Sequence, residues 1–320
     1  EYLIVMFFSA FTDYYTSLFI YNTPETNKKK RRFLLFVTLI VNLGMLFYFK
    51  YLYFVLDNSN SILSYFNIDF NFTLYHILLP FGISFYTFET ISYTVDVYRG
   101  ITKPEKSFLN YFLFVTFFPK LVAGPIQRAS ELIPQFKKIY QLDFENVAYG
   151  LKRIIYGLFL KVVVADNVAG FVDDAYAINY SMASAIDVFT LAFLFGFQIY
   201  FDFSAYSHIA LGTARLFNIH IPENFDFPYL ATSMKSFWKR WHISLSAWIR
   251  DYLYLPISGV IVTNSSGKSG IGKSLDKNRN QRSTFALFIT WSIMGLWHGA
   301  NWTFLFWGFT GLRKRFQSLR

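Results

Sequence analysis

The sequence predicts an all-α, polytopic membrane protein, because its residues are largely apolar and gather in long tracts. Hydrophobic residues make up 54% of the 320 residues and charged residues 16%, against about 25% charged residues in a soluble domain. About 20 apolar residues cross a bilayer as a helix. Tracts near or above that length cover residues 1–21, 33–49, 70–88 and 283–312, and we expect them to lie in the membrane.

The composition also limits the other classes of protein. The chain has no cysteine, which excludes disulfides and thiolate sites. No histidine spacing indicates a metal site, and no phosphate-binding glycine loop occurs. We predict a single membrane-embedded domain over residues 1–320, with no bound metal or cofactor. The sequence lacks an initial methionine and stops behind an apolar run, so we expect it to be a fragment at both ends.

The positions of the charges predict the topology. A net charge of +10 suits basic cytoplasmic loops better than nucleic-acid binding, so we expect membrane lipids around the chain and no nucleic-acid partner. Residues 28–32, residues 99–106 and a basic loop at 263–283 are expected on the cytoplasmic side. The Asp-bearing connections 57–69 and 166–187 are expected outside.

Two regions do not fit simple spanning helices. Residues 108–123 and 147–165 both lie between an inside and an outside loop, where an odd number of crossings is needed, and Pro119, Gly124 and Pro125 interrupt the first segment. Such re-entrant backbone requires a protein interior or a wet cavity. Residues 196–256 carry too many charges for one span, so short helices half within the membrane are expected there. Trp238, Trp241 and Trp248 stand at helical spacings within this region.

Five groups of motifs carry a resemblance to a known family. In chain order they are PFGISFY at 80–86 with DVYRG at 96–100, FP at 118–119 with AGPI at 123–126, YFDFSAYS at 200–207, FWKRWHISLS at 237–246 with WIRDYLY at 248–254, and GLWHGA at 295–300. Together they resemble the membrane-bound O-acyltransferase family, alginate O-acetyltransferase branch. The similarity runs from about residue 33 to 311. The sequence departs from the branch at His208, at residues 257–260 and in its long basic loop, which affects the choice of acceptor and partner more than the chemistry.

The resemblance implies a multi-helix bundle with re-entrant and short helices around a central funnel or tunnel. Such a protein moves an acyl group, here most simply acetyl, from a cytoplasmic thioester to a hydroxyl outside the membrane. The family's invariant histidine corresponds to His298, and the second recurrent polar position of the branch to His242. Both are therefore the expected catalytic residues.

The position of His298 along the predicted helix also indicates a function, independently of the resemblance. At about 1.5 Å per helical residue it lies roughly 22 Å beyond Ser283, past the middle of a ~30 Å hydrocarbon slab. An ionisable side chain at this depth normally faces the protein interior or a wet channel. A neutral imidazole there could accept the proton of an acceptor hydroxyl. A histidine bonded to a neighbouring helix is the structural alternative. Asn301 and Trp297 are candidate N–H donors to the developing oxyanion.

The other candidates are weighed against structural roles. His242 could position the donor or acceptor, or cap an interfacial helix. Asp202, together with Trp241 and Arg250, is a further candidate for substrate binding, although structural support is the favoured role for Asp202. Arg250 and the adjacent Asp251 do not face each other on a helix, so each is expected to pair elsewhere.

Glu89 and Asp96 are seven residues apart and share a helix face, which suits either a proton or cation relay or ion pairing between helices.

Several questions stay open at the level of the sequence. The alternative function is a transporter or channel whose intramembrane His and Asp residues line a substrate path, although no internal repeat supports it. The donor is acetyl-CoA or an acyl-carrier thioester. The resemblance implies alginate, another exopolysaccharide or peptidoglycan as acceptor, with D-alanine transfer to teichoic acid in a neighbouring branch. It also implies a secreted or periplasmic acyltransferase partner, an acyl carrier protein as a further candidate partner, and a bacterial inner-membrane location.

Overall fold

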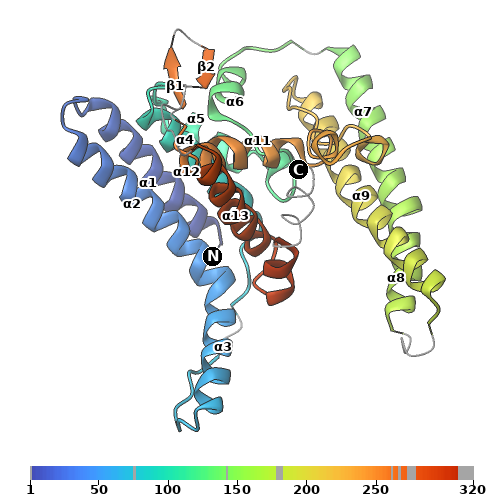
Figure 1. Cartoon of the computed structure of the whole chain (residues 1–320). Coiled ribbons are helices and arrows are strands. Elements are labelled where there is room, and N and C mark those ends of the chain that lie inside the picture. The colour runs from blue at the N-terminus through green and yellow to red at the C-terminus, as the bar shows by residue number, and fades with distance from the viewer. Residues whose placement is uncertain are drawn as a thin grey trace. The chain divides into compact units, whose positions relative to one another are not determined.

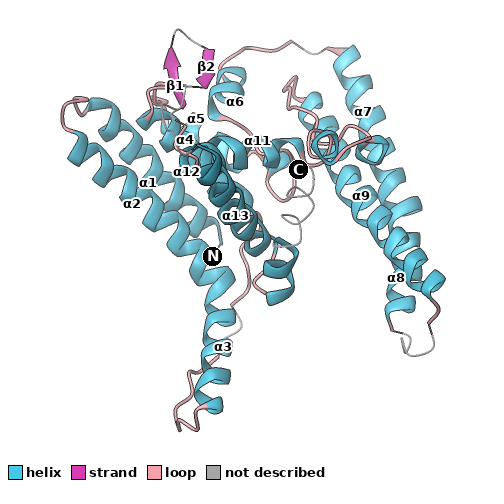
Figure 2. Ribbon diagram, in the orientation of Figure 1, coloured by secondary structure: helices cyan, strands magenta, loops and turns pink. Residues whose placement is uncertain are grey.

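The computed structural model describes residues 2–74, 77–141, 143–177, 183–260, 262–265, 268–271 and 279–308. Within these residues the regular secondary structure is helical, apart from one antiparallel pair of four-residue strands, β1 (Val262–Ser265) and β2 (Lys268–Ile271) (Figures 1 and 2). The chain forms two compact units. Unit 1 comprises Glu1–Val115 with Ala247–Arg320, and unit 2 comprises Thr116–Ser246.

Four helical stretches among the described residues are long and apolar enough to cross a membrane. They are Tyr2–Asn22, Lys28–Tyr65, Phe144–Tyr176 and Ala185–Leu216. The predicted helical membrane fold is therefore confirmed. The strand pair lies within the predicted basic loop 263–283, of which residues 266–267 and 272–278 are outside the described residues.

Unit 1 is built on α1 (Tyr2–Asn22), α2 (Lys28–Leu46) and α4 (Ile83–Tyr98), which pack against one another. The contact face of α1 is rich in small and polar residues, which permit close approach between helices in a membrane. The face contains Ser9, Ala10, Asp13 and Ser17, all completely buried. The loop that leads into α2 ends at Asn27, whose side chain accepts a hydrogen bond from the backbone of Lys30.

A polar cluster ties these three helices together. The amide of Asn42 on α2 donates to both carboxylate oxygens of Asp13 on α1, at 2.9 Å each. The amide oxygen of Asn42 accepts from Ser9 at 2.7 Å and from Thr90 of α4 at 3.1 Å. Because buried polar groups need partners, this cluster specifies how the three helices align.

The predicted apolar tract 70–88 is not one spanning helix. The described residues from 67 to 82 form no helix, and α4 begins only after Gly82, whose φ is +73°. Pro80 and Gly82 explain the interruption, since proline disfavours helix at the preceding residue and glycine accepts a left-handed conformation. Twelve of the sixteen residues of α4 are buried, so this helix lies inside the unit.

In the part of the chain that the structure describes, three π-helical segments interrupt or extend the helices. They are η1 (Phe47–Tyr51), between α2 and α3 (Leu52–Tyr65); η3 (Phe159–Ala165), between α7 (Phe144–Leu158) and α8 (Asp166–Tyr176); and η6 (Arg250–Tyr254), between α11 (Ile243–Ile249) and α12 (Leu255–Ile257). Such wide turns are rare and are frequently found at functional sites. Each of these three contains a basic residue, namely Lys50, Lys161 and Arg250.

The main feature of unit 2 is a long helical hairpin. The continuous run α7, η3 and α8 packs along α9 (Ala185–Leu216) (Figure 1). Gly150 and Gly212 let the backbones touch, because a Cβ at Gly212 would lie 2.5 Å from the carbonyl oxygen of Gly150. The connection predicted at 166–187 contains α8 up to Tyr176 and the start of α9 from Ala185. Residues 196–216 likewise belong to α9 rather than to short helices.

The rest of unit 2 is made of short elements, as predicted for the stretch before Pro256. The elements are η2 (Phe118–Lys120), α6 (Ala129–Phe136), η5 (Pro228–Leu230), α10 (Met234–Phe237) and the start of α11. The break in the first apolar segment is also confirmed, because α5 (Phe108–Thr116) has only nine residues. The three tryptophans do not share one helix, since α10 ends before Trp238 and α11 begins after Trp241.

Candidate active site

Three aromatic rings form a continuous stack in unit 1. Phe88 of α4 lies between Trp248 of α11, at 3.9 Å between ring centroids, and Trp297 of α13 (Arg279–His298), at 5.1 Å. The indole of Trp248 also donates to the carbonyl of Phe88 at 2.8 Å. Large stacked rings contribute both buried area and a defined geometry, so the stack fixes the residue that precedes His298.

The C-terminal end of α13 is capped by side chains of η1. The ammonium of Lys50 donates to the carbonyl of Trp297, and the hydroxyl of Tyr51 donates to the carbonyl of Leu296 at 3.0 Å. Lys50 also contacts the Ser84 hydroxyl at 3.3 Å and lies 5.5 Å from the ring centre of Trp297. The last carbonyls of a helix lack partners within the helix, and here two side chains supply them.

His298 is the last residue of α13, and its side chain is exposed. Its ring stands edge-on between Trp297, at 5.0 Å between centroids, and Trp307, at 5.3 Å. The described residues provide no hydrogen bond to its ring nitrogens, so the alternative of a histidine bonded to a neighbouring helix finds no support among them. The imidazole is therefore held by aromatic rings and open to a reactant.

Two glycines explain the local sequence around this histidine. After His298 the chain turns and forms a short helix over residues 302–308 that lies against α13. A Cβ at Gly295 or Gly299 would collide with Phe304. Larger residues at these two positions would therefore push the returning helix away from His298.

The two predicted oxyanion donors differ in the structure. Trp297 is 7% exposed, and its indole N–H has no hydrogen-bond partner within the described residues. Asn301 is exposed, and its side-chain oxygen accepts from the backbone N–H and the hydroxyl of Thr303, at 3.0 and 3.1 Å. Asn301 thus caps the helix over 302–308, and only its amide N–H groups remain for a ligand.

His242 lies in unit 2 at a sharp turn before α11. Its φ is +42°, a left-handed conformation that is uncommon for a residue with a side chain. Its carbonyl accepts from the backbone of Ser246 at 3.0 Å, so it occupies the N-cap position of the helix. The ring is 2% exposed and stands edge-on to Phe203, at 4.7 Å between centroids.

Asn224 determines which nitrogen of His242 carries a proton. Its side-chain oxygen accepts from the backbone N–H of Ser244 at 3.2 Å and from the Ser244 hydroxyl at 2.9 Å. A backbone N–H only donates, so the atom facing it is the oxygen. The same oxygen lies 3.2 Å from Nδ1 of His242, which must therefore donate. Neutral His242 then presents its lone pair on Nε2.

Trp241 and Asp202 have structural neighbours in the same unit. Trp241 packs on Phe237, Phe225, Tyr200 and Tyr229, an aromatic cluster rather than an open site. Asp202 is exposed, not buried, and pairs with Lys161 of η3 at 2.6 Å; the same ammonium contacts Asp166 at 2.8 Å. The favoured structural role of Asp202 thus agrees with its ion pair.

The prediction for Arg250 and Asp251 is wrong. The guanidinium of Arg250 makes two hydrogen bonds to the carboxylate of its neighbour, at 2.7 and 3.2 Å. The pair lies at the start of η6, where the wider turn and the long arginine side chain permit this contact.

Glu89 and Asp96 are both buried on α4. Asp96 accepts from the hydroxyl of Tyr252 at 2.8 Å, which ties η6 to α4.

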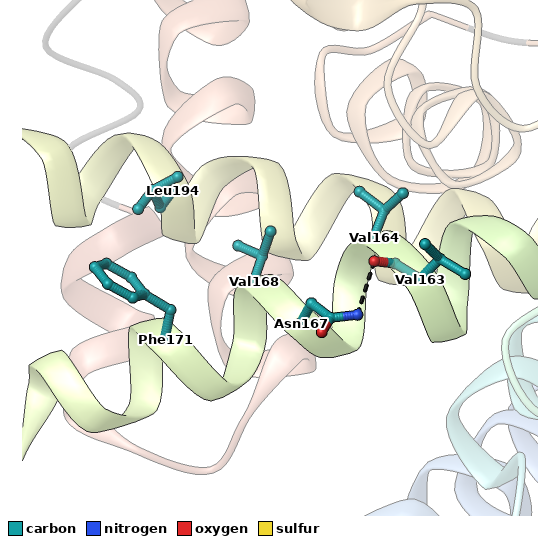
Figure 3. Close-up of a pocket in the computed structure, with 6 residues that line it drawn as sticks. All are labelled: Val163, Val164, Asn167, Val168, Phe171 and Leu194. Carbon is teal, nitrogen blue, oxygen red and sulfur yellow. Dashed lines mark hydrogen bonds between the residues drawn. The ribbon is translucent and has the colours of Figure 1, made fainter.

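The helical hairpin of unit 2 has a groove, and none of the candidate site residues lines it. It encloses about 310 Å³ and is lined by Val163, Val164, Asn167, Val168, Phe171 and Leu194 (Figure 3). The Asn167 amide donates to the carbonyl of Val163 at 2.8 Å, which leaves an apolar lining. The groove lies between two candidate membrane spans, Phe144–Tyr176 and Ala185–Leu216.

Sequence reasoning missed Lys50, Tyr51 and Asn224. Lys50 stands alone in the apolar stretch 33–56, and an isolated lysine in a candidate span is itself a signal of function or pairing. Asn224 carries no such signal, because its role depends on a turn that brings it to residues 242–244.

These elements define a multi-pass helical membrane protein whose two candidate catalytic histidines, His242 and His298, lie at helix ends. The family match is specific: the chain belongs to the membrane-bound O-acyltransferase family, which matches residues 104–312. The matched region contains both His242 and His298.

Named relatives extend the match. The chain is 41% identical to the probable alginate O-acetylase AlgI of Azotobacter vinelandii over 270 residues, which are 84% of this chain and 50% of the relative. It is 38% identical to the peptidoglycan O-acetyltransferase of Helicobacter pylori over 334 aligned positions, 96% of this chain and 59% of the relative. A teichoic acid D-alanyltransferase of Streptococcus thermophilus is 30% identical, over 71% of this chain and 54% of the relative. The chain spans about half the length of the curated relatives it matches.

Proposed function

We propose that this chain is the membrane-embedded part of an O-acyltransferase that acts on a polymer of the bacterial cell envelope. The family and the alginate and peptidoglycan acetyltransferase relatives support this class of reaction. The observation that carries the proposal is His298, an exposed imidazole at the end of α13 with rings on two sides. Acetyl is the acyl group that best fits the relatives' names.

In the proposed reaction, His298 takes the proton of an acceptor hydroxyl while the oxygen of that hydroxyl attacks the carbonyl carbon of the thioester. The carbon–oxygen bond forms, the carbon–sulfur bond breaks, and the thiolate leaves with the proton that the imidazolium returns. A positioned general base of this kind contributes about 10²- to 10⁴-fold. The buried indole N–H of Trp297, which lacks a partner within the described residues, is the better of the two proposed oxyanion donors.

His242 has the second proposed role. Asn224 holds its ring so that Nε2 carries the lone pair, and this nitrogen would orient the donor or acceptor. Asp202 and Arg250 are engaged in ion pairs, and Trp241 lies in an aromatic cluster. Substrate binding by these three would require them to exchange partners, so we assign them to the scaffold.

The remaining steps concern donor, acceptor and partner. We propose a cytoplasmic thioester, acetyl-CoA or an acyl carrier, as donor, and an inner-membrane location with the acceptor outside. A secreted or periplasmic partner would complete transfer to the polymer. The relatives' names favour a polysaccharide or peptidoglycan as acceptor. The transporter alternative has less support, since the family is one of acyltransferases.

The decisive test is thioester consumption by the whole protein in lipid nanodiscs. Radiolabelled acetyl-CoA is supplied, and the unchanged protein is compared with His298→Ala. We expect transfer or hydrolysis to fall at least about 100-fold while the Tm changes little, because the ring is exposed. Turnover by His298→Ala at the unchanged rate would refute the assignment.

A further inference from the structure

An intramembrane lysine lies beside the proposed base. Lys50 belongs to η1, within the candidate span Lys28–Tyr65. A lysine in such a segment usually pairs with carboxylates or backbone carbonyls, or marks a functional path. Here its ammonium meets the carbonyl of Trp297, the hydroxyl of Ser84 and the face of the Trp297 ring.

We propose that Lys50 is a positioning residue that fixes the end of α13, and with it the imidazole of His298, in the orientation that acyl transfer needs. This inference rests on the proposed function of His298. Lys50 acts through the backbone of the residue directly before His298, so it need not touch the substrate.

The depth of the two residues agrees independently with this pairing. Lys50 follows Arg32 of the basic segment by 18 residues, about 27 Å of helix. His298 follows the basic residue Arg282 by 16 residues, about 24 Å. If both helices start from the cytoplasmic side, as their charges predict, Lys50 and His298 reach the same level of the bilayer, and the structure places them together.

The π-helical turn explains how Lys50 reaches its partner. A wide turn rotates the side chains that follow it relative to an α-helix. Both Lys50 and the adjacent Tyr51 then point to α13, at the carbonyls of Trp297 and Leu296. In addition, a positive charge at a helix C-terminus interacts favourably with the helix dipole. Two neighbouring residues of η1 thus hold two consecutive carbonyls of α13.

The kinetic test compares Lys50→Met, which keeps the length of the side chain without its charge, with Lys50→Arg, which keeps the charge. The whole protein in nanodiscs is assayed with acetyl-CoA. We expect kcat to fall about tenfold or more in Lys50→Met, since misplacement by 1 Å can cost about 100-fold. The KM for acetyl-CoA should stay within about threefold, and Lys50→Arg should recover most of kcat. Lys152→Met, which removes an exposed lysine from α7, is the matched control.

A second measurement reports position without activity. The chain has no cysteine, so Ala300→Cys places a single thiol in it, two residues after His298. We expect a water-soluble maleimide to label this thiol several-fold faster, or several-fold more slowly, in the Lys50→Met background than with Lys50 present. If Lys50→Met fails to fold, Tyr51→Phe removes the neighbouring cap, and Tyr48→Phe on the same turn, whose side chain is exposed, is its control.

The two proposals fail in different ways. Unchanged labelling in Lys50→Met, or an unchanged kcat, overturns the positioning role. Recovery of kcat by Lys50→Arg together with altered labelling supports it. Full activity of His298→Ala would instead refute the proposed function, while the labelling result would still decide whether Lys50 holds the end of α13.

Discussion

At the scale of single residues, the hydrogen bonds of His242 separate a structural role from a chemical one. Its backbone caps α11 in a left-handed conformation, and its Nδ1 donates to Asn224. Either of these contacts alone would justify a polar residue that tolerates positive φ. Nε2 takes part in neither of these two contacts, so a variant that keeps the cap and a donor in place of Nδ1 but lacks Nε2 tests the chemistry.

Asparagine is such a variant, because it accepts left-handed φ and its amide can replace the Nδ1 donor. We expect His242→Asn to fold with a lowered Tm, because the buried ring no longer packs on Phe203, and to lose about 100-fold in acyl transfer. The measurements are thermal unfolding in detergent and thioester consumption in nanodiscs. Full transfer by a folded His242→Asn would assign this histidine to the cap alone. Ser246→Ala, which removes one long 3.4 Å hydrogen bond nearby, is the control for small structural changes.

His220 makes stability depend on pH. Its imidazole is exposed, but the part of the ring that is desolvated lowers its pKa from the ordinary value, and the charges of Arg215 and Lys138 lower it further. Arg215 also donates a hydrogen bond to Nε2 of His220 at 2.8 Å. The unfolded chain therefore binds a proton at a higher pH than the folded one, so stability falls as pH drops from about 6.5 through the lowered pKa.

We expect a loss below about 1 kcal/mol, because the side chain is exposed and screened. Thermal unfolding at pH 7.5 and pH 5 should show it, and His220→Gln should reduce the difference. The backbone of residue 220, which bonds to the side chain of Gln135, is unchanged by that substitution. An identical pH dependence in His220→Gln would assign the effect to other groups.

At the scale of elements, each of the three π-helical turns among the described residues contains a basic residue that has a partner. Lys50 on η1 caps another helix, and Lys161 on η3 joins Asp166 and Asp202. Arg250 on η6 pairs with its own neighbour. A buried or lipid-facing charge requires a partner, and a wide turn redirects a side chain without ending the helix. These turns therefore let long helices contain charge.

The hairpin of α7 and α9 offers a matched pair of substitutions. A Cβ at Gly212 would lie 2.5 Å from the carbonyl oxygen of Gly150, whereas a Cβ at Gly170 of α8 would meet no atom within 4 Å. We expect Gly212→Ala to destabilise the protein by about 1–3 kcal/mol through overpacking. Gly170→Ala should be neutral or stabilise it by up to about 1 kcal/mol, since alanine favours helix. Thermal unfolding of the two variants checks this, and equal effects would contradict the close backbone contact.

Sequence patterns predicted some elements better than others, for physical reasons. The helical structure of residues 2–21 and 33–49 follows directly from the apolar tracts at 1–21 and 33–49. The long α9 was not predicted, because an unpaired Asp202 would be unfavourable in a membrane helix. Its partner Lys161 lies 41 residues earlier in the chain, and only the structure shows this ion pair. Similarly, the break between Trp241 and α11 depends on the left-handed backbone at His242, which no spacing rule shows. His298 and His242 came from motifs, whereas Lys50 and Asn224 required three-dimensional contacts.

At the scale of the whole molecule, the distribution of charge and the helices predict one orientation in the membrane. The basic residues 28–32 precede the candidate span Lys28–Tyr65, and the acidic Asp57 and Asp69 lie near its other end. Positive residues are retained on the cytoplasmic side. The same rule places residues 99–106 inside. The rule also places the C-terminal end of α8, with Asp173 and Asp174, on the outside.

Single cysteines can test this orientation directly, because the chain contains none of its own. Ser64 and Ala177 are exposed at the predicted outer side, and Thr26 and Lys103 are exposed at the predicted inner side. In intact cells whose outer membrane is permeable to the reagent, we expect a charged maleimide to label Ser64→Cys and Ala177→Cys. Thr26→Cys and Lys103→Cys should react only after the inner membrane is opened. Labelling of Thr26→Cys in intact cells would reverse the orientation, and with it the proposal that the thioester donor reaches this protein from the cytoplasm.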